Sequence, residues 1–133
     1  MEKYRKILVA VNSSEVFCQK LIKTAKSLAV DNGTSIRLIY VLRSTYVAAL
    51  NFKIQKAKQT LSRLGRQFDI PQQELKVRIG HPKSTVFKEA EKIGSDLVIL
   101  ADTRQTGGVW LLPNKICRAL ETSVMTWDLS PVF

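Results

Sequence analysis

The sequence is poor in the residues that most often carry catalysis or bind transition metals. It has one histidine, His81, and two cysteines, Cys18 and Cys117, which are far apart and lack metal-ligand spacing. The glycine patterns of P-loops, dinucleotide folds and nucleophile elbows are also absent. We therefore expect neither a metal site nor an enzyme, and we expect both cysteines to be buried, reduced thiols.

Long apolar runs are missing as well. No segment approaches the roughly 20 residues that a membrane-spanning helix needs. The N-terminal stretch up to Asn12 carries cations, but its apolar run is too short for a secretory signal. We expect one cytoplasmic domain over residues 1–133, because this length suffices for a single hydrophobic core.

Acidic residues are scarce, and one long stretch has none. The chain has 21 Lys and Arg against 11 Asp and Glu, a net charge of +10, and no acid occurs between Asn32 and Phe68. Helical periodicity places part of the excess on the polar side of a helix, at Lys53, Lys56, Arg63 and Arg66. This surface is either a solvated helix face or a site for an anionic or protein partner.

Apolar periodicity alternates along the chain between that of strands and that of helices. The expected strands are Lys6–Val11, Ser35–Leu42, Glu74–Ile79, Asp96–Ala101 and Ser123–Leu129. The expected helices are Glu15–Asp31, Tyr46–Phe68, Pro82–Ile93 and Asn114–Glu121. Since consecutive strands joined by helices are parallel, the pattern predicts an α/β fold, a Rossmann-like, doubly wound sandwich.

Three segments resemble the universal stress protein family: KILVAVNSSE, LIYVL and RIGHPKSTVFKEAEKIGSDLVILAD. The resemblance covers nearly the whole chain. It implies a five-stranded parallel sheet of order 3-2-1-4-5 between helices, as in folds like the adenine nucleotide alpha hydrolases. It also implies a regulatory role in the stress response and frequent dimerisation through the last strand.

Many proteins that this chain resembles bind ATP through a glycine motif after the fourth strand, where backbone N–H groups approach the phosphates closely. None of the four motif positions keeps its residue type here; the register places them at Ala101, Arg104, Asn114 and Lys115. The usual ribose-contacting aspartate corresponds to Asn12, which Ser13 follows, whereas Val41 keeps an adenine-contacting position. The resemblance therefore implies a degenerate site that does not hold ATP in the usual manner.

Two functions remain open at this point. In the first, the protein is a dimeric regulator that has no cofactor and acts through partners. In the second, it binds a nucleotide or another anion, and Arg104 and Lys115 supply charge in place of the lost backbone contacts. A lysine in the first turn of a helix opposes the helix dipole by about 0.3–1 kcal/mol unless an anion lies there. The alternative for Lys115 is an exposed side chain in solvent.

The last expected strand, Ser123–Leu129, has the features of an edge that pairs with a second copy. It has no Lys or Arg and would expose an apolar strip if left alone, at Met125, Trp127 and Leu129. The alternative is that this strip packs on the domain's own helices. The apolar residues Trp110, Leu111 and Leu112, expected in a loop, either extend the contact or fold over the vacant nucleotide cleft.

Overall fold

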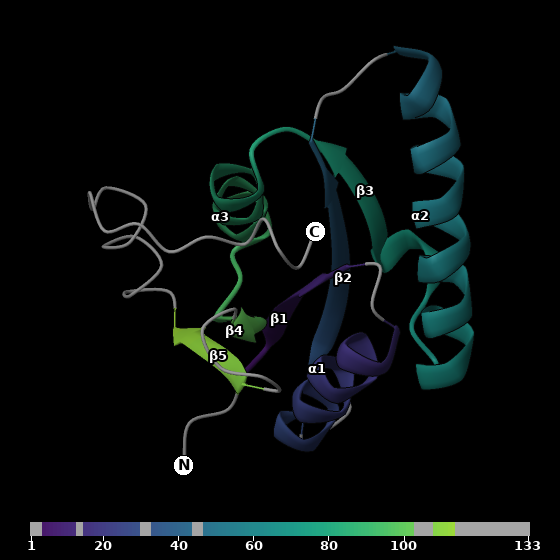
Figure 1. The fold of residues 1–133 in the computed structure, drawn as a ribbon. Helices are drawn as coiled ribbons and strands as arrows, with labels where there is room; N and C mark the ends of the chain where they lie inside the picture. Colours follow the sequence, from purple (N-terminus) through teal and green to yellow (C-terminus); the bar gives the residue numbers. More distant parts are fainter. Residues whose placement is uncertain (1–3, 13–14, 30–32, 44–46, 103–107, 114–133) are drawn as a thin grey trace.

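The sheet and its helices are known from a computed structural model that describes residues 4–12, 15–29, 33–43, 47–102 and 108–113 (Figure 1). The strands are β1 (Lys6–Val11), β2 (Ser35–Leu42), β3 (Leu75–Ile79), β4 (Leu97–Asp102) and β5 (Gly108–Pro113). The helices are α1 (Glu15–Leu28), α2 (Val47–Phe68) and α3 (Pro82–Ile93), and a short 3-10 turn, η1 (Gln72–Glu74), precedes β3. Within these residues no helix is long and apolar enough to cross a membrane.

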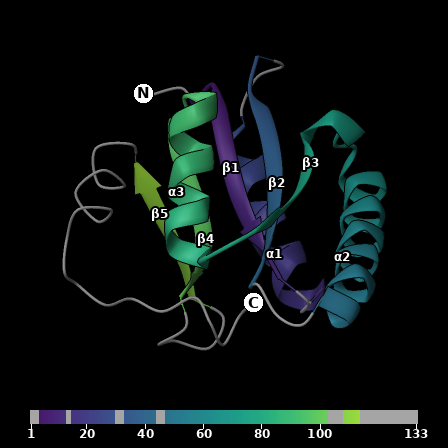
Figure 2. The same cartoon turned by 90° about the horizontal axis from the view of Figure 1, so that it is seen from above.

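The strands form one sheet of order β3-β2-β1-β4-β5, with β3 beside α2 at one edge and β5 at the other (Figure 2). β1 to β4 are parallel to one another. Every residue of β1 after Lys6 is buried, as expected for a central parallel strand covered on both faces. The predicted α/β class and the predicted strand order are therefore confirmed.

Helices α1 and α2 cover one face of the sheet and α3 covers the other (Figure 1). Because side chains alternate along a strand, β1 supplies both cores. Ile7, Val9 and Val11 pack with residues of α1 and α2, whereas Leu8 and Ala10 pack with residues of α3. The two cores hold the carboxyl ends of β1, β2 and β4 at one edge of the sheet, where α/β proteins usually bind ligands.

Helix α2 approaches β3 closely at its last turns. A Cβ atom on Gly65 would lie 2.9 Å from Leu75 Cδ1 and 3.2 Å from the backbone oxygen of Ile70. The backbone N–H of Ile70 donates to Gly65 O at 2.8 Å, and Asp69 between them has a left-handed φ of 57°. These are the features of a Schellman-type helix end, which directs the chain straight into η1 and β3.

The prediction for the fifth strand was wrong in residues and in direction. The place beside β4 belongs to β5, which is antiparallel, with Asp102 opposite Gly108 and Leu97 opposite Pro113. The resemblance placed a phosphate loop over this segment. Its local residues are nevertheless typical of a strand, since glycines and a proline bound the apolar run VWLL. The expected helix Asn114–Glu121 and strand Ser123–Leu129 lie outside the described residues.

Candidate functional site

The structure brings three of the predicted site residues to one edge of the sheet. β1 and β2 are in register with Val11 opposite Tyr40, and β1 and β4 with Val9 opposite Ile99. Continuing these registers places Asn12 beside Val41 and close to Ala101, at the carboxyl ends of three neighbouring strands. Four other predicted positions lie outside the described residues: Ser13, Arg104, Asn114 and Lys115.

Asn12 is buried and held by a cysteine of α1. Its backbone N–H donates to Cys18 Sγ at 3.2 Å, and the thiol lies 3.3 Å from Asn12 O and 3.7 Å from Asn12 Oδ1. Both residues are 0% exposed, and Cys18 is a free thiol, as the sequence predicts. Asn12 thus ties the end of β1 to the start of α1 and presents no surface to a ribose.

Val41 is also fully buried. It belongs to the core on the α3 face, together with Ile39 and Val86. Its side chain therefore packs against the helix that covers this face. An adenine ring could reach it only if these contacts opened.

Ala101 has strand neighbours instead of a loop around it. It lies opposite Val109 of β5, and β1 flanks β4 on the other side. β5 then runs back along β4, so that Pro113 lies opposite Leu97 at the amino end of the sheet. At about 3.3 Å per residue, Pro113 is roughly 17 Å from Gly108. β5, which lies between the second and third motif positions, therefore runs away from the edge where phosphates would be held.

A network of ion pairs joins α3 to β2 and β3 on the other side of the sheet from α2. Arg37 Nη1 lies 2.8 Å from Glu89 Oε2, Arg37 Nε lies 3.1 Å from Glu74 Oε2, and Arg78 Nε lies 3.3 Å from Glu89 Oε1. Glu89 is 4% exposed. Burial alone lowers the pKa of Arg37, but hydrogen bonds with Glu74 and Glu89 outweigh it, so that this pKa is raised. Arg37 stays cationic and is neutralised within the fold.

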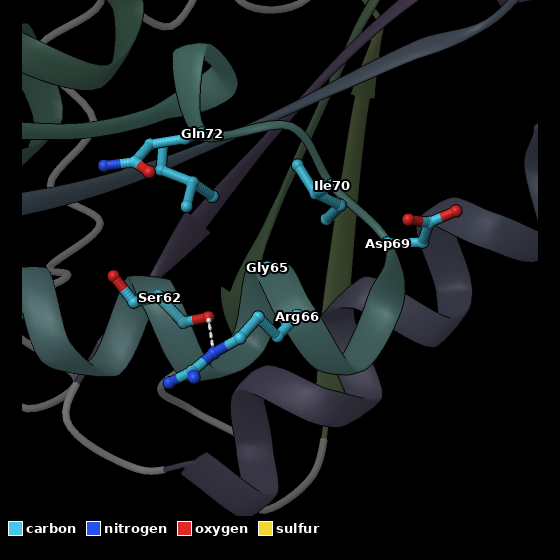
Figure 3. Close-up of a pocket in the computed structure, with 7 residues that line it drawn as sticks. Ser62, Gly65, Arg66, Asp69, Ile70 and Gln72 are labelled. Carbon is cyan, nitrogen blue, oxygen red and sulfur yellow. Dashed lines mark hydrogen bonds between the residues drawn. The ribbon is translucent and has the colours of Figure 1, made fainter.

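The basic surface predicted on α2 is confirmed as exposed at Lys53, Lys56, Arg63 and Arg66. Lys56 Nζ lies 5.0 Å from the centre of the Phe52 ring, and Phe52 is itself 63% exposed. Beside this surface, a hollow of about 600 Å³ opens between the end of α2 and the segment leading to β3 (Figure 3). Sequence reasoning missed this hollow because its residues come from different elements. The periodicity of a sequence does not reveal how such elements pack together.

No metal centre is present in the part of the chain that the structure describes, where no three His, Cys, Asp or Glu side chains cluster. The described residues also bring no nucleophile and base together at the carboxyl edge of the sheet. The described side chains at that edge, Asn12 and Val41, are buried in packing contacts. The exposed cations of α2 can attract anions.

The comparisons with known proteins agree with this fold. The profile of the universal stress protein family matches residues 3–112. Universal stress protein A homolog 2 of Coxiella burnetii is 25% identical over 118 residues, which cover 80% of this chain and 81% of that protein.

Solved structures are similar at lower identity. Universal stress protein UspA from Lactobacillus plantarum has a TM-score of 0.59 at 21% identity, over 77% of this chain and 80% of that one. A universal stress protein family protein from Arabidopsis thaliana with AMP bound has a TM-score of 0.54 at 18% identity, over 92% and 90%. Since the family profile spans more than half of the sequence, the chain belongs to the universal stress protein family.

Proposed function

We propose that the protein is a regulatory member of its family that acts through partners and does not bind ATP in the usual family manner. The observation that carries this proposal is the β4–β5 hairpin. Where the family resemblance implies a phosphate loop, β5 forms a strand whose last residue, Pro113, lies opposite Leu97 at the amino end of the sheet. The burial of Asn12 and Val41 supports it, because neither side chain offers a surface to a nucleoside.

The proposal includes neither catalysis nor a bound cofactor. It is supported by the carboxyl edge of the sheet, where the buried residues Asn12 and Cys18 are hydrogen-bonded to each other. A cytoplasmic location stays a prediction from the sequence.

A second candidate function is binding of a nucleotide or another anion through Arg104 and Lys115. What favours it is the Arabidopsis relative, whose structure has AMP bound. Both residues lie outside the described part of the chain. The two candidates differ in one property, which is whether the native protein carries a nucleotide.

Mass spectrometry of the supernatant after denaturing purified protein distinguishes these candidates. We expect no adenine nucleotide above about one-tenth of the protein concentration, because binding weaker than about 100 μM does not survive purification. The Arabidopsis relative whose structure has AMP bound, prepared identically, gives the comparison. An equimolar nucleotide released from this protein would favour the second candidate instead.

We also propose a homodimer that forms beside β5. The outer edge of β5 pairs with no other strand in the described residues, and unpaired edges favour contact with another chain. The apolar strip predicted at Met125, Trp127 and Leu129 would add to the contact, although it lies outside the described residues.

Light scattering at tens of micromolar protein tests the dimer. The chain mass is 15.0 kDa, so we expect about twice this value. Trp127→Glu is expected to give a monomer, and Phe52→Glu, on the exposed side of α2, is expected to leave the dimer intact. A monomeric wild-type protein would contradict the proposal, and a dimer that withstands Trp127→Glu but not Leu111→Glu would place the contact on β5 alone.

A further inference from the structure

The outer edge of β3 has no strand beside it in the described part of the chain. Gly80, directly after β3, donates its backbone N–H to Leu42 O at 2.9 Å, so this side of the backbone faces β2. Because backbone groups alternate along a strand, Val77 and Ile79 direct theirs away from β2. Ile79 is 47% exposed at the end of this edge. A further strand could therefore extend the sheet here.

A groove runs between this edge and α2, and we call it the α2–β3 groove. It consists of two adjoining hollows of about 600 and 350 Å³, whose linings share Ser62, Gln72 and Leu75. Figure 3 shows the larger one, between the last turns of α2 and the segment that begins at Asp69. The groove thus follows the strand edge along its length and has a helix as its opposite wall.

The rim of the α2–β3 groove is basic and its floor is apolar. One acid, Asp69, lines the two hollows together with four cations: Lys58, Arg66, Lys76 and Arg78. Leu61 and Ile70 are buried beneath them. Of these four cations, only Arg78 belongs to the ion-pair network of Arg37, Glu74 and Glu89, through its contact with Glu89. The groove therefore combines a positive potential with an unpaired strand edge.

We propose that the α2–β3 groove binds an acidic, extended segment of a protein partner as an added strand next to β3. Backbone pairing with Val77 and Ile79 would supply affinity, as in other cases of strand addition. Arg78 Nη1 now donates to Val77 O at 3.2 Å, and the incoming backbone would take over this contact. The freed Nη1 could then bind a carboxylate of the peptide, while Nε keeps its contact with Glu89.

The alternation of strand side chains predicts which residues the peptide should carry. One row would face the α2 side, where Lys58 and Arg66 rim an apolar floor. The other row would face the side of the sheet toward which Lys76 and Arg78 alternate, since Leu75 and Val77 pack on the α2 side. In a peptide of alternating β-branched and acidic residues, the β-branched row would lie over the apolar floor on the α2 side. The acidic row would lie on the side of Lys76 and Arg78.

Other occupants fit the groove less well. A second copy of this chain that paired its own β3 here would bring two basic groove rims together, and these rims would repel each other. A nucleic acid would gain from the cations, but no aromatic side chain lines the groove to stack on bases. A nucleic acid also cannot use the backbone groups of a strand edge.

This inference deepens the proposal that the protein acts through partners, but its test does not measure nucleotide binding, so either can fail alone. The probe is a labelled, acetylated nine-residue peptide of alternating Glu and Val, titrated by fluorescence anisotropy with the full chain. We expect binding to weaken at least about tenfold between 50 and 300 mM salt. We expect the same loss when the peptide is N-methylated at alternate residues, because this removes the backbone donors.

Two double variants locate the site. Lys58→Glu/Lys76→Glu is expected to weaken peptide binding at least about tenfold, since it reverses two rim charges. Lys23→Glu/Lys92→Glu changes the net charge equally at exposed positions outside the groove and should weaken it less than about threefold. Equal losses in both variants, undiminished binding of the N-methylated peptide, or tighter binding of single-stranded DNA of matched charge would each overturn the proposal.

Discussion

Replacing Glu89 with alanine is expected to lower the free energy of unfolding by about 3 kcal/mol. Glu89 is 4% exposed and accepts from both Arg37, at 2.8 Å, and Arg78, at 3.3 Å. Its removal leaves the mostly buried Arg37 with Glu74 alone, and an incompletely paired buried charge costs far more than a surface ion pair contributes. The same change removes the ion pairs of α3 with β2 and β3, whereas the apolar contacts of Val86, Phe87 and Ala90 remain.

Urea denaturation followed by circular dichroism measures this loss. Glu91→Ala is the matched control, because it removes the same group from an exposed position of the same helix. The control should change the free energy of unfolding by less than about 0.5 kcal/mol. If Glu89→Ala proved as mild as Glu91→Ala, the network would add nothing to the apolar packing of α3 on the sheet.

Replacing Asn12 with aspartate introduces the residue type that the family resemblance implies for this position, yet it is expected to destabilise this protein by about 2–4 kcal/mol at neutral pH. Asn12 is 0% exposed, and its Oδ1 lies 3.7 Å from the Cys18 thiol. Burial would raise the pKa of the new carboxyl above the roughly 3.9 of an exposed aspartate. The penalty is therefore complete above the raised pKa, shrinks as the pH falls below it, and disappears only below about 3.9, where the folded and the unfolded states are both protonated.

Unfolding measured at pH 7.5 and at pH 4.5 tests the sign as well as the size of this effect. Asn51→Asp makes the same chemical change at an exposed position of α2 and should shift stability by less than about 0.5 kcal/mol at either pH. A variant that kept wild-type stability at pH 7.5 would show that Asn12 faces solvent, as a ribose-binding residue must.

Local patterns predicted most of the fold because each depends on neighbouring residues. The bounds of β1, β2 and α3 were predicted without error, and α2 begins one residue after its predicted start. The implied order 3-2-1-4-5 places the third strand at an edge of the sheet, and β3 is at the edge. α1 ends at Leu28, before the predicted Asp31. That residues 1–133 form one domain stays a prediction.

Features that depend on distant residues could not be predicted. Arg37 was counted with the cations of an acid-free stretch, but Glu74 and Glu89 neutralise it from 37 and 52 residues away. β5 was missed for another reason, since the family resemblance outweighed a local strand signal at Val109 to Leu112. The α2–β3 groove arises only once a helix and a strand pack together.

Calorimetric titration with ATP and magnesium tests the central claim most directly, because the claim is that β5 occupies the segment for which the family resemblance implies a phosphate loop. The dissociation constant is expected to be weaker than about 100 μM, which corresponds to a binding free energy no more favourable than about −5.5 kcal/mol. The Arabidopsis relative whose structure has AMP bound is titrated in parallel. A low-micromolar constant for this chain, lost on Lys115→Ala, would contradict the account.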